Sequence, residues 1–321
     1  MPTPLNHYIT GLEISPADRI KMLNLALLLK HLPAYGQYLL NRKKFIFLSE
    51  KPSLRTRLSI ASLTDLGANV LDLTGSIHPK ESFEDVLRVI DGQGFDGLFY
   101  RSHETADKLQ TLASLTKKTV LINALSKDDH PLQVEADLLT FFEHFGTLNN
   151  LKIVYIGEYN NVAKSLEKLV PPLGPSMHFC CPPLSASPQA LVKEADVLYT
   201  DTHASMGQAP VDLKELRVTQ ELLSHTHKDS SMVAHCGPAT PKEICPDLAK
   251  SPRSLILAQA VNRKYTTQAL AVYLQNEMPQ RDDVLERLRN LSLKPIRAFT
   301  PTFQPIIKPG LLRLASRALR H

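Results

Sequence analysis

The sequence of 321 residues contains no tryptophan, only four cysteines and few glycines. Aromatic surfaces on which nucleic-acid bases stack are therefore scarce. The cysteines form no Cys-x-x-Cys pair, and no histidine is placed to complete a tetrahedral zinc site. These absences exclude a disulfide scaffold and a zinc-binding module, and they predict a reduced, intracellular protein without a metal.

Long apolar runs are also missing. The longest, such as 23–29, fall far short of the roughly 20 residues that a membrane span requires. The first residues show neither a basic stretch followed by an apolar run nor an arginine-rich amphipathic segment, so neither secretion nor organelle import is indicated. We therefore expect a soluble, cytoplasmic protein that does not bind a membrane.

The charge is uneven along the chain. The formal net charge is +5, from 37 Lys+Arg against 32 Asp+Glu. Residues 281–321 hold nine Lys/Arg and three Asp/Glu, so the rest of the chain is close to neutral. The basic excess therefore characterises the C-terminal tail and does not by itself indicate an anionic substrate.

Short apolar runs alternate with segments of helical period. This alternation predicts an α/β protein with two doubly wound domains, each a mainly parallel sheet flanked by helices. The predicted strands are 44–48, 68–73, 97–100, 119–122, 151–156, 196–199, 232–234 and 255–257. The predicted helices are 60–66, 83–90, 134–145, 162–169, 281–290 and a basic segment at 311–319. The Pro/Ser-rich stretch 171–188 gives no clear prediction.

The segment after the first predicted strand, Glu50-Lys-Pro-Ser-Leu-Arg-Thr-Arg57, has the features of an anion site. If Ser53 caps the following helix, free backbone N–H groups, the positive end of the helix dipole and the guanidinium groups of Arg55 and Arg57 converge. Such a point binds phosphate, although a capped surface helix with two solvated arginines is the alternative. Pro52, with no glycine nearby, argues against a Walker loop.

Other polar residues follow the remaining predicted strands, at the edge where open α/β sheets bind ligands. Those of the first half are Arg101, Asn123, His130 and Gln133, and those of the second are Asn161, Asp201, Ser205 and Cys236. An arginine, a histidine and an amide can polarise a carbonyl group, and a carboxylate beside amides and a hydroxyl suits a zwitterionic amino acid. Cys236 is a candidate nucleophile, but His235 would point the opposite way along a continuing strand.

Five motifs in order resemble those of the aspartate/ornithine carbamoyltransferase family, and of its ornithine branch in particular. They are Ser-x-Arg-Thr-Arg, His-Pro-x-Gln, Asn-Asn, Asp-x-x-x-Ser-Met-Gly and His-Cys-x-Pro, within a resemblance that runs from about Tyr8 to Leu274. The resemblance implies transfer of the carbamoyl group of carbamoyl phosphate to the δ-amine of L-ornithine, giving L-citrulline and phosphate. It also implies a homotrimer that needs neither a metal nor an organic cofactor.

The resemblance assigns roles to individual residues. Carbamoyl phosphate would be held by Ser53, Leu54, Arg55, Thr56, Arg57, Arg101, His130, Gln133 and Arg263. Ornithine would be held by Asn161, Asp201, Ser205, Met206, Cys236 and Gly237. Catalysis would rest on Arg101, His130, Cys236 and Arg263.

The family pattern also divides the chain. Residues 1–136 would form the carbamoyl phosphate-binding domain and residues 137–260 the ornithine-binding domain. A C-terminal helix within 261–280 would pack back on the first domain. The basic tail 281–321 lies outside the family pattern.

Some positions depart from the family. Gly237 stands where the family has Leu, His203 where it has Trp, and the loop 75–80 lacks the Gln that the family sends into a neighbouring site. The segment from Asn161 to Asp201 is short, which predicts a trimmed second domain. Three alternatives therefore stay open: a carbamoyltransferase for another amine, a catalytically silent binding or regulatory relative, and a nucleic-acid role of the tail. The last is not expected, because no aromatic motif accompanies the charge.

Overall fold

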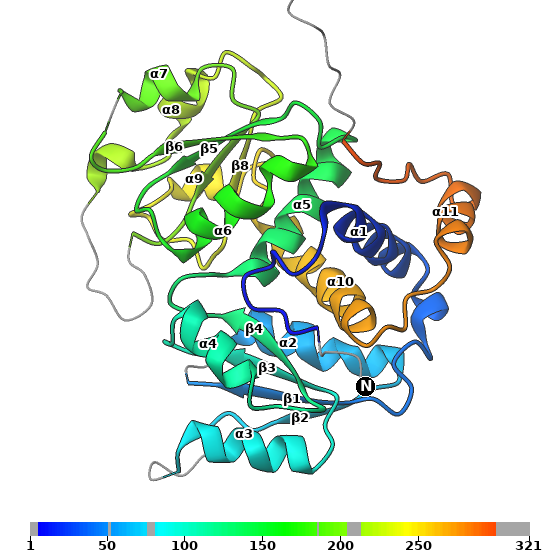
Figure 1. The fold of residues 1–321 in the computed structure, drawn as a ribbon. Helices are drawn as coiled ribbons and strands as arrows, with labels where there is room; N and C mark the ends of the chain where they lie inside the picture. Colours follow the sequence, from blue (N-terminus) through cyan, green and yellow to red (C-terminus); the bar gives the residue numbers. More distant parts are fainter. Residues whose placement is uncertain (1–5, 51–52, 76–80, 185, 204–212, 300–321) are drawn as a thin grey trace, which may run out of the picture.

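Two parallel four-stranded sheets form the framework of the protein, as the alternating pattern predicts (Figure 1). The structure is a computed structural model that describes residues 6–50, 53–75, 81–184, 186–203 and 213–299. The first sheet has the order β2-β1-β3-β4 and the second β6-β5-β7-β8. The strands are β1 Lys44–Ser49, β2 Asn69–Asp72, β3 Gly97–Arg101, β4 Val120–Leu125, β5 Lys152–Ile156, β6 Ser176–Cys180, β7 Val197–Thr200 and β8 Met232–His235.

Helices connect the strands and cover the sheets. They are α1 Pro16–His31, α2 Leu54–Ala61, α3 Phe83–Gly92, α4 Ala106–Ala113, α5 Pro131–Phe145, α6 Asn161–Leu169, α7 Pro188–Val192, α8 Gln220–Ser224, α9 Pro246–Ala249, α10 Ile256–Leu274 and α11 Arg281–Asn290. Short 3₁₀ turns lie at Pro33–Gly36, Ser62–Leu66, Pro171–Leu173 and Lys214–Leu216. Side chains of Ser82, Thr105 and Asn160 cap α3, α4 and α6 by accepting backbone N–H bonds of the first turn. None of the helices in the described ranges is long and apolar enough to cross a membrane.

Burial explains why several strands read as continuous apolar runs. All residues of β7 and of β4 and β8, which end their sheets on one side, are buried, whereas the opposite edge strands β2 and β6 are largely exposed or half-buried. Parallel strands covered on both faces need apolar side chains at every position. The exposed, mixed composition of β6 is the reason that the stretch 171–188 gave no strand prediction.

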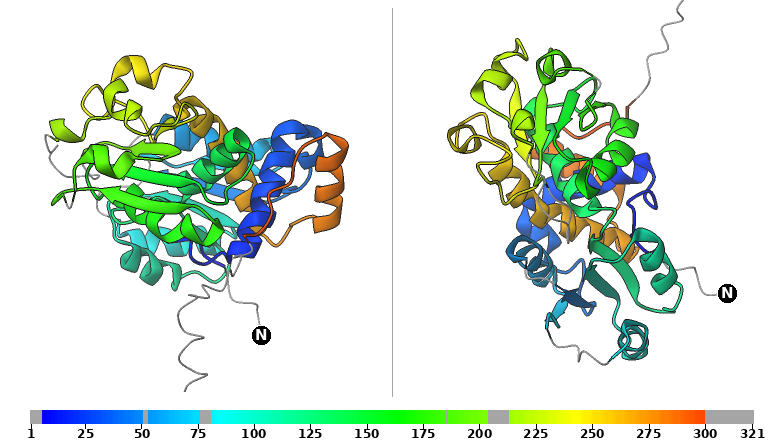
Figure 2. Two further views of the ribbon diagram at one scale, coloured as in Figure 1. Left: turned by 90° about the horizontal axis from the view of Figure 1, so that it is seen from above. Right: turned by 90° about the vertical axis from the view of Figure 1, so that its left-hand side faces the viewer.

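Helices α1, α5 and α10 come from distant parts of the sequence and lie between the two sheets (Figures 1 and 2). Helix α10 packs against α1, α2 and α5, and α11 packs against α1. One hydrophobic core cluster contains Phe45 of the first sheet, Tyr155 of the second and Leu270 of α10. The two sheets therefore share one core through these helices, although each has a further cluster of its own on its other face.

A buried ion pair fastens α1 to α5. The Arg19 Nε atom lies 2.9 Å from Glu135 Oε1, and both side chains are almost fully buried. The hydroxyl of Tyr8 donates to the same carboxylate oxygen over 2.8 Å. A buried charge is costly unless it is paired, so these contacts fix α1 firmly against α5, the helix that connects the first sheet to the second.

One strand prediction is wrong. Residues 255–257 are not a strand, because α10 begins at Ile256 and only Ser254 makes a bridge, to Val233. The run Ser254-Leu-Ile-Leu257 is too short for period alone to distinguish strand from helix. The exposed fraction of Leu257 is 76%, which a central strand would not tolerate. The helix expected within 261–280 runs from Ile256 to Leu274, helix 281–290 forms as predicted, and 311–319 lies outside the described residues.

Candidate functional site

The carboxyl ends of both sheets open onto one cavity of about 520 Å³. Strand register places Ser49 beside Arg101 and Arg101 beside Leu125 in the first sheet, and Thr200 beside His235 in the second. The predicted site residues that line this cavity are Ser53, Leu54, Arg55, Arg101, His130, Asn161, Asp201, Cys236, Gly237 and Arg263. The structure thus brings together residues from both halves of the chain.

Three arginines give the cavity a positive wall. Arg55 comes from α2, Arg101 from the end of β3 and Arg263 from α10. Burial lowers the pKa of Arg263 to about 10, and burial together with the charge of Arg55 lowers the pKa of Arg101. Even with these lowered pKa values, Arg101 and Arg263 remain charged at neutral pH, so this wall is suited to a phosphate or another compact anion.

His130 is a neutral imidazole beside these arginines. It is 1% exposed, precedes α5 as its N-cap residue, and its backbone N–H donates to Ser165 Oγ over 2.9 Å. Burial holds its pKa well below the ordinary value, and the positive charges of Arg263, Arg101 and Arg55 lower it further. Its Nδ1 atom has no hydrogen-bond partner among the described residues. A neutral imidazole with a free nitrogen can hydrogen-bond a substrate carbonyl or amide.

Two predicted residues act on Arg263 and are absent from the cavity lining. Arg263 Nη1 donates to Gln133 Oε1 over 3.2 Å, and Arg263 Nη2 donates to Thr56 Oγ1 over 3.3 Å. The hydroxyl of Ser53 donates to the same Thr56 oxygen over 3.0 Å. These contacts orient the guanidinium group of Arg263 toward the cavity.

Behind Arg263 lies a buried carboxylate that the motif analysis did not select. Asp137 on α5 accepts hydrogen bonds from Gln133 Nε2 at 2.8 Å, Gln259 Nε2 at 2.7 Å and the hydroxyl of Tyr199 at 2.9 Å. The Oε1 atom of Gln259 also accepts the backbone N–H of His235 over 3.0 Å. Asp137 and Gln259 belong to none of the five motifs but lie within the range from about Tyr8 to Leu274 that resembles the family, and this broader resemblance was the available signal.

The opposite wall carries an acid. Asp201 follows β7, is 6% exposed, and accepts a hydrogen bond from Asn160 Nδ2 over 3.0 Å. Burial raises the pKa of Asp201 to about 7. Of the Asn-Asn pair, Asn160 contacts Asp201, whereas Asn161 Nδ2 donates to the backbone oxygen of Ser126 over 2.8 Å. The Asn-Asn motif therefore pointed to the right place, but Asn160, and not the predicted Asn161, is the hydrogen-bond partner of Asp201.

Cys236 lacks the properties of a nucleophile. Burial and the charge of Asp201 raise the pKa of its thiol, so no thiolate is available at neutral pH. Burial lowers the pKa of His235 to about 3, and its Nδ1 accepts the backbone N–H of Gly237 over 2.6 Å. This imidazole therefore orders the turn after β8 and does not activate the thiol.

Some expected site residues lie elsewhere. The Arg57 Nε atom lies 2.6 Å from Asp72 Oδ2 in a half-exposed ion pair, and Arg57 is not part of the cavity lining. Asn123 is fully buried in β4, where its Nδ2 donates to the backbone oxygen of Ile9 over 2.7 Å. Ser205 and Met206 fall outside the described residues. Within the described ranges, no three His, Cys, Asp or Glu side chains are grouped so that they could hold a metal.

Comparison with known proteins identifies the family. The model for the carbamoyl-P binding domain of aspartate/ornithine carbamoyltransferase matches residues 6–143, and the model for its Asp/Orn binding domain matches residues 183–274. An ornithine carbamoyltransferase of Anoxybacillus flavithermus is 32% identical in an alignment that covers 83% of this chain and 96% of that relative. The chain belongs to the aspartate/ornithine carbamoyltransferase family. An ornithine carbamoyltransferase of a Synechocystis species is 35% identical over 73% of this chain and 85% of that relative.

Solved structures of the carbamoyltransferase family share the fold. The ornithine carbamoyltransferase from Pyrococcus furiosus superposes with a TM-score of 0.75 at 28% identity, covering 84% of this chain and 97% of that chain. The enzyme from Thermus thermophilus gives a TM-score of 0.73 at 30% identity, covering 81% of this chain and 95% of that chain. The match extends over nearly the full length of these relatives, so it includes both sheets and the cavity between them.

Gly237 lies against Arg55. Its φ angle is +72°, in the left-handed region, and a Cβ atom at this position would overlap Arg55 Nη1. In the space that glycine leaves, Arg55 Nη1 donates to the backbone oxygen of Cys236 over 2.8 Å. Glycine at this position thus allows Arg55 of α2 to bond directly to the turn that follows β8.

Replacing Gly237 by alanine should therefore displace Arg55 and strain the backbone. We expect Gly237→Ala to lower the free energy of unfolding by about 1–2 kcal/mol, because a side chain is disfavoured in the left-handed conformation. Urea unfolding followed by circular dichroism measures this. The matched control is Gly92→Ala, at a helical site with no heavy atom within 4 Å, which should leave stability unchanged or raise it. An equal loss of unfolding free energy in both variants would contradict the explanation by backbone strain at Gly237.

Proposed function

We propose that this protein transfers the carbamoyl group of carbamoyl phosphate to the δ-amine of L-ornithine, giving L-citrulline and phosphate. One observation carries the proposal: three arginines and a neutral His130 line the same cavity as the carboxyl group of Asp201. The arginines and His130 suit a phosphate and a carbonyl group, and Asp201 suits an ammonium group.

The positive wall would bind the donor. Arg55, Arg101 and Arg263, with Ser53 and the N-terminal N–H groups of α2, would hold the phosphate of carbamoyl phosphate. Gln133 and Thr56 would keep Arg263 in place through the hydrogen bonds described above. Carbamoyl phosphate would thereby be fixed with its carbonyl oxygen near Arg101 and His130.

The chemical step follows from this placement. The lone pair of the δ-nitrogen attacks the carbamoyl carbon, and negative charge develops on the carbonyl oxygen, where Arg101 and His130 stabilise it. The bond from this carbon to the phosphate oxygen then breaks. The departing phosphate takes the proton that the attacking nitrogen releases, while the arginines neutralise its charge.

The acidic wall would select the acceptor. Asp201 and Asn161 would bind the α-ammonium group of a free amino acid, and Ser205, Met206, Cys236 and Gly237 would complete the ornithine site. An N-acylated ornithine has no α-ammonium group to pair with Asp201, so the site favours the free amino acid.

A citrulline assay with purified protein tests the proposal. Turnover of ornithine with carbamoyl phosphate is the expected result, and turnover of another amine such as lysine or putrescine, with none for ornithine, would reassign the acceptor. Calorimetric binding of carbamoyl phosphate without turnover of any amine would instead identify a silent relative.

The pH dependence should report Asp201. Its pKa of about 7 means that the carboxylate forms only as pH rises through that value, and the δ-amine, with an ordinary pKa near 10.4, also loses its proton on the alkaline side. We expect kcat/KM for ornithine to rise from pH 6 to pH 9. In Asp201→Asn, the rise of kcat/KM near pH 7 should disappear, and kcat/KM should fall by about tenfold to a hundredfold. An unchanged profile in this variant would remove Asp201 from the binding role.

We further propose that the protein is a cytoplasmic homotrimer. Apolar side chains suited to an interface are exposed on the packed helices α2 and α10, namely Leu54 and Leu58 on the first and Leu257 and Val261 on the second. Each pair is four residues apart and so shares a helix face. Light scattering of the full-length protein would give the number of subunits.

A further inference from the structure

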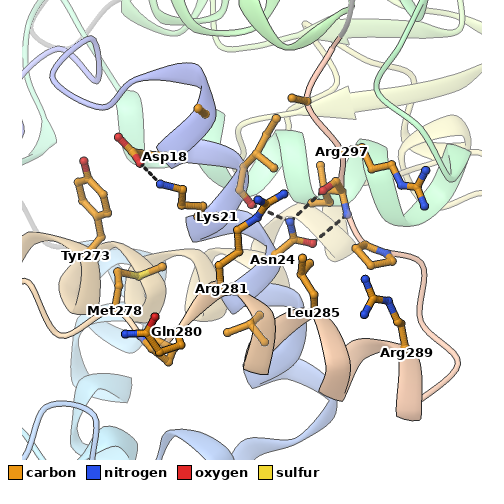
Figure 3. A pocket seen from close by; sticks show the side chains of 17 residues that line it. Asp18, Lys21, Asn24, Tyr273, Met278, Gln280, Arg281, Leu285, Arg289 and Arg297 are labelled. Atoms are coloured by element: carbon orange, nitrogen blue, oxygen red, sulfur yellow. Dashed lines mark hydrogen bonds and ion pairs between the residues drawn. The ribbon is translucent and has the colours of Figure 1, made fainter.

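A second cavity, of about 970 Å³, lies at the other end of α10 (Figure 3). Its walls are α1, the end of α10, α11 and residues 295–298. It shares no lining residue with the cavity described above. The family model ends at residue 274, so much of this cavity is built by the part of the chain that follows.

The walls are held in place by specific contacts. Asn24 on α1 is 4% exposed, and its amide pairs with the backbone of Ile296: Nδ2 donates to the oxygen over 2.9 Å and Oδ1 accepts the N–H over 2.8 Å. The hydroxyl of Tyr35 donates to Asp283 of α11 over 2.7 Å, and Arg287 stacks on the Tyr35 ring. The Asn24–Ile296 pair forms part of the cavity lining, whereas Tyr35, Asp283 and Arg287 lie outside it, and together these contacts preform the cavity.

The charge around the cavity is strongly positive. Figure 3 shows Lys21, Arg281, Arg289 and Arg297 among the residues that line it. The single acidic residue of the lining, Asp18, is paired with Lys21 at 2.7 Å. Arg281, Arg289 and Arg297 form no ion pair with any described residue. Three arginines around one cavity thus have no anion to neutralise them within the described chain.

The floor of the same cavity is apolar. Ile20, Met278, Val284, Leu285 and Ile296 contribute to its lining. Free inorganic ions or sugars gain nothing from such a floor, whereas a hydrocarbon or aromatic body is stabilised there by removal of apolar surface from water. The flexible thioether of Met278 adapts to different shapes.

We propose that this cavity binds a small anionic amphiphile, a carboxylate or phosphate head group on an aliphatic or aromatic body. The head group would pair with Arg281 and Arg289, whose guanidinium forks match carboxylate and phosphate oxygens. The body would lie on the apolar floor. The segment 300–321 has four Lys/Arg and no Asp/Glu, so its charge has the same sign as that of the cavity and does not complement it.

The test uses the full-length protein and the fluorescent probe 1-anilinonaphthalene-8-sulfonate, an aromatic anion. We expect one saturable site from which dodecanoate or dodecyl phosphate, kept below micelle-forming concentrations, displaces the probe. Relative potency of these two competitors distinguishes a carboxylate ligand from a phosphate ligand. Dodecanol has the same chain without the charge and should compete at least about tenfold less well. Equal competition by dodecanol would overturn the proposal.

Variants locate the site. Arg281→Gln combined with Arg289→Gln should weaken probe binding by about tenfold, whereas Arg88→Gln, a surface arginine of α3 that is not in the cavity lining, should leave it unchanged. Circular dichroism and citrulline formation verify that each variant folds. Binding must also persist in excess inorganic phosphate, which separates this cavity from the proposed active site. Loss of probe binding in excess phosphate, or equal probe affinity in all variants, would refute the proposal that the probe binds in this cavity.

Discussion

Replacing Arg101 by alanine is expected to lower kcat for citrulline formation by about 10²–10³-fold, the usual effect of losing one donor to a developing oxyanion. Arg101 ends β3 and faces the cavity beside His130, so in the proposed reaction its guanidinium group stabilises the carbonyl oxygen as the amine attacks. Steady-state kinetics in both substrates measures the change.

The control for this variant is Arg88→Ala. Arg88 is a surface arginine of α3 whose side chain is 60% exposed and pairs only with Asp85 in the described structure. Its removal should leave kcat within about twofold, since exposed pairs contribute little. A similar loss in both variants would mean that the effect of Arg101→Ala is not specific to the site.

Replacing Asp137 by leucine is expected to lower the free energy of unfolding by about 3–5 kcal/mol. The change leaves the buried donors of Gln133, Gln259 and Tyr199 without their common acceptor, and each unsatisfied donor costs about 1–3 kcal/mol before the site relaxes. Because the protein lacks tryptophan, unfolding in urea is best followed by circular dichroism. Asp137→Asn keeps a carbonyl acceptor and should lose clearly less; an equal loss would contradict the hydrogen-bond explanation.

Asp137 also predicts a direction for the pH dependence of stability. Burial raises its pKa in the folded protein from the ordinary 3.8 to about 6, so the folded state binds a proton more tightly than the unfolded chain does. The contribution of this group to stability is therefore full below about pH 4 and declines as pH rises through 6. Asp137→Asn should remove that slope.

The sequence predicted the fold class because buried parallel strands leave continuous apolar runs between helices of clear period. It failed at β6, whose edge position permits polar residues, and at residues 255–257, where three apolar residues begin a helix. The local pattern of apolar and polar residues indicates which side chains are buried. It does not indicate which other segment covers them, because that depends on contacts between distant parts of the sequence.

Most of the cavity lining was predictable because the carboxyl ends of parallel strands lie at the same edge of a sheet. The exception of Arg57 has a simple physical origin: residues two apart on a helix do not face each other, so Arg55 and Arg57 on α2 cannot both point into one cavity. Asp137 and Asn160 were harder to select, since their roles arise from contacts with Tyr199 and Asp201, which lie 62 and 41 residues further along the chain.

The place of α10 between the sheets affects how the protein can be made. Its residues, including Arg263, are synthesised about 110–140 residues after the α5 surface that they cover, which at ordinary translation rates is a delay on the order of ten seconds. Throughout this time the apolar face of α5 lacks its final partner. The nascent chain therefore needs protection from aggregation until α10 has emerged from the ribosome, and only then can the arginine wall be completed.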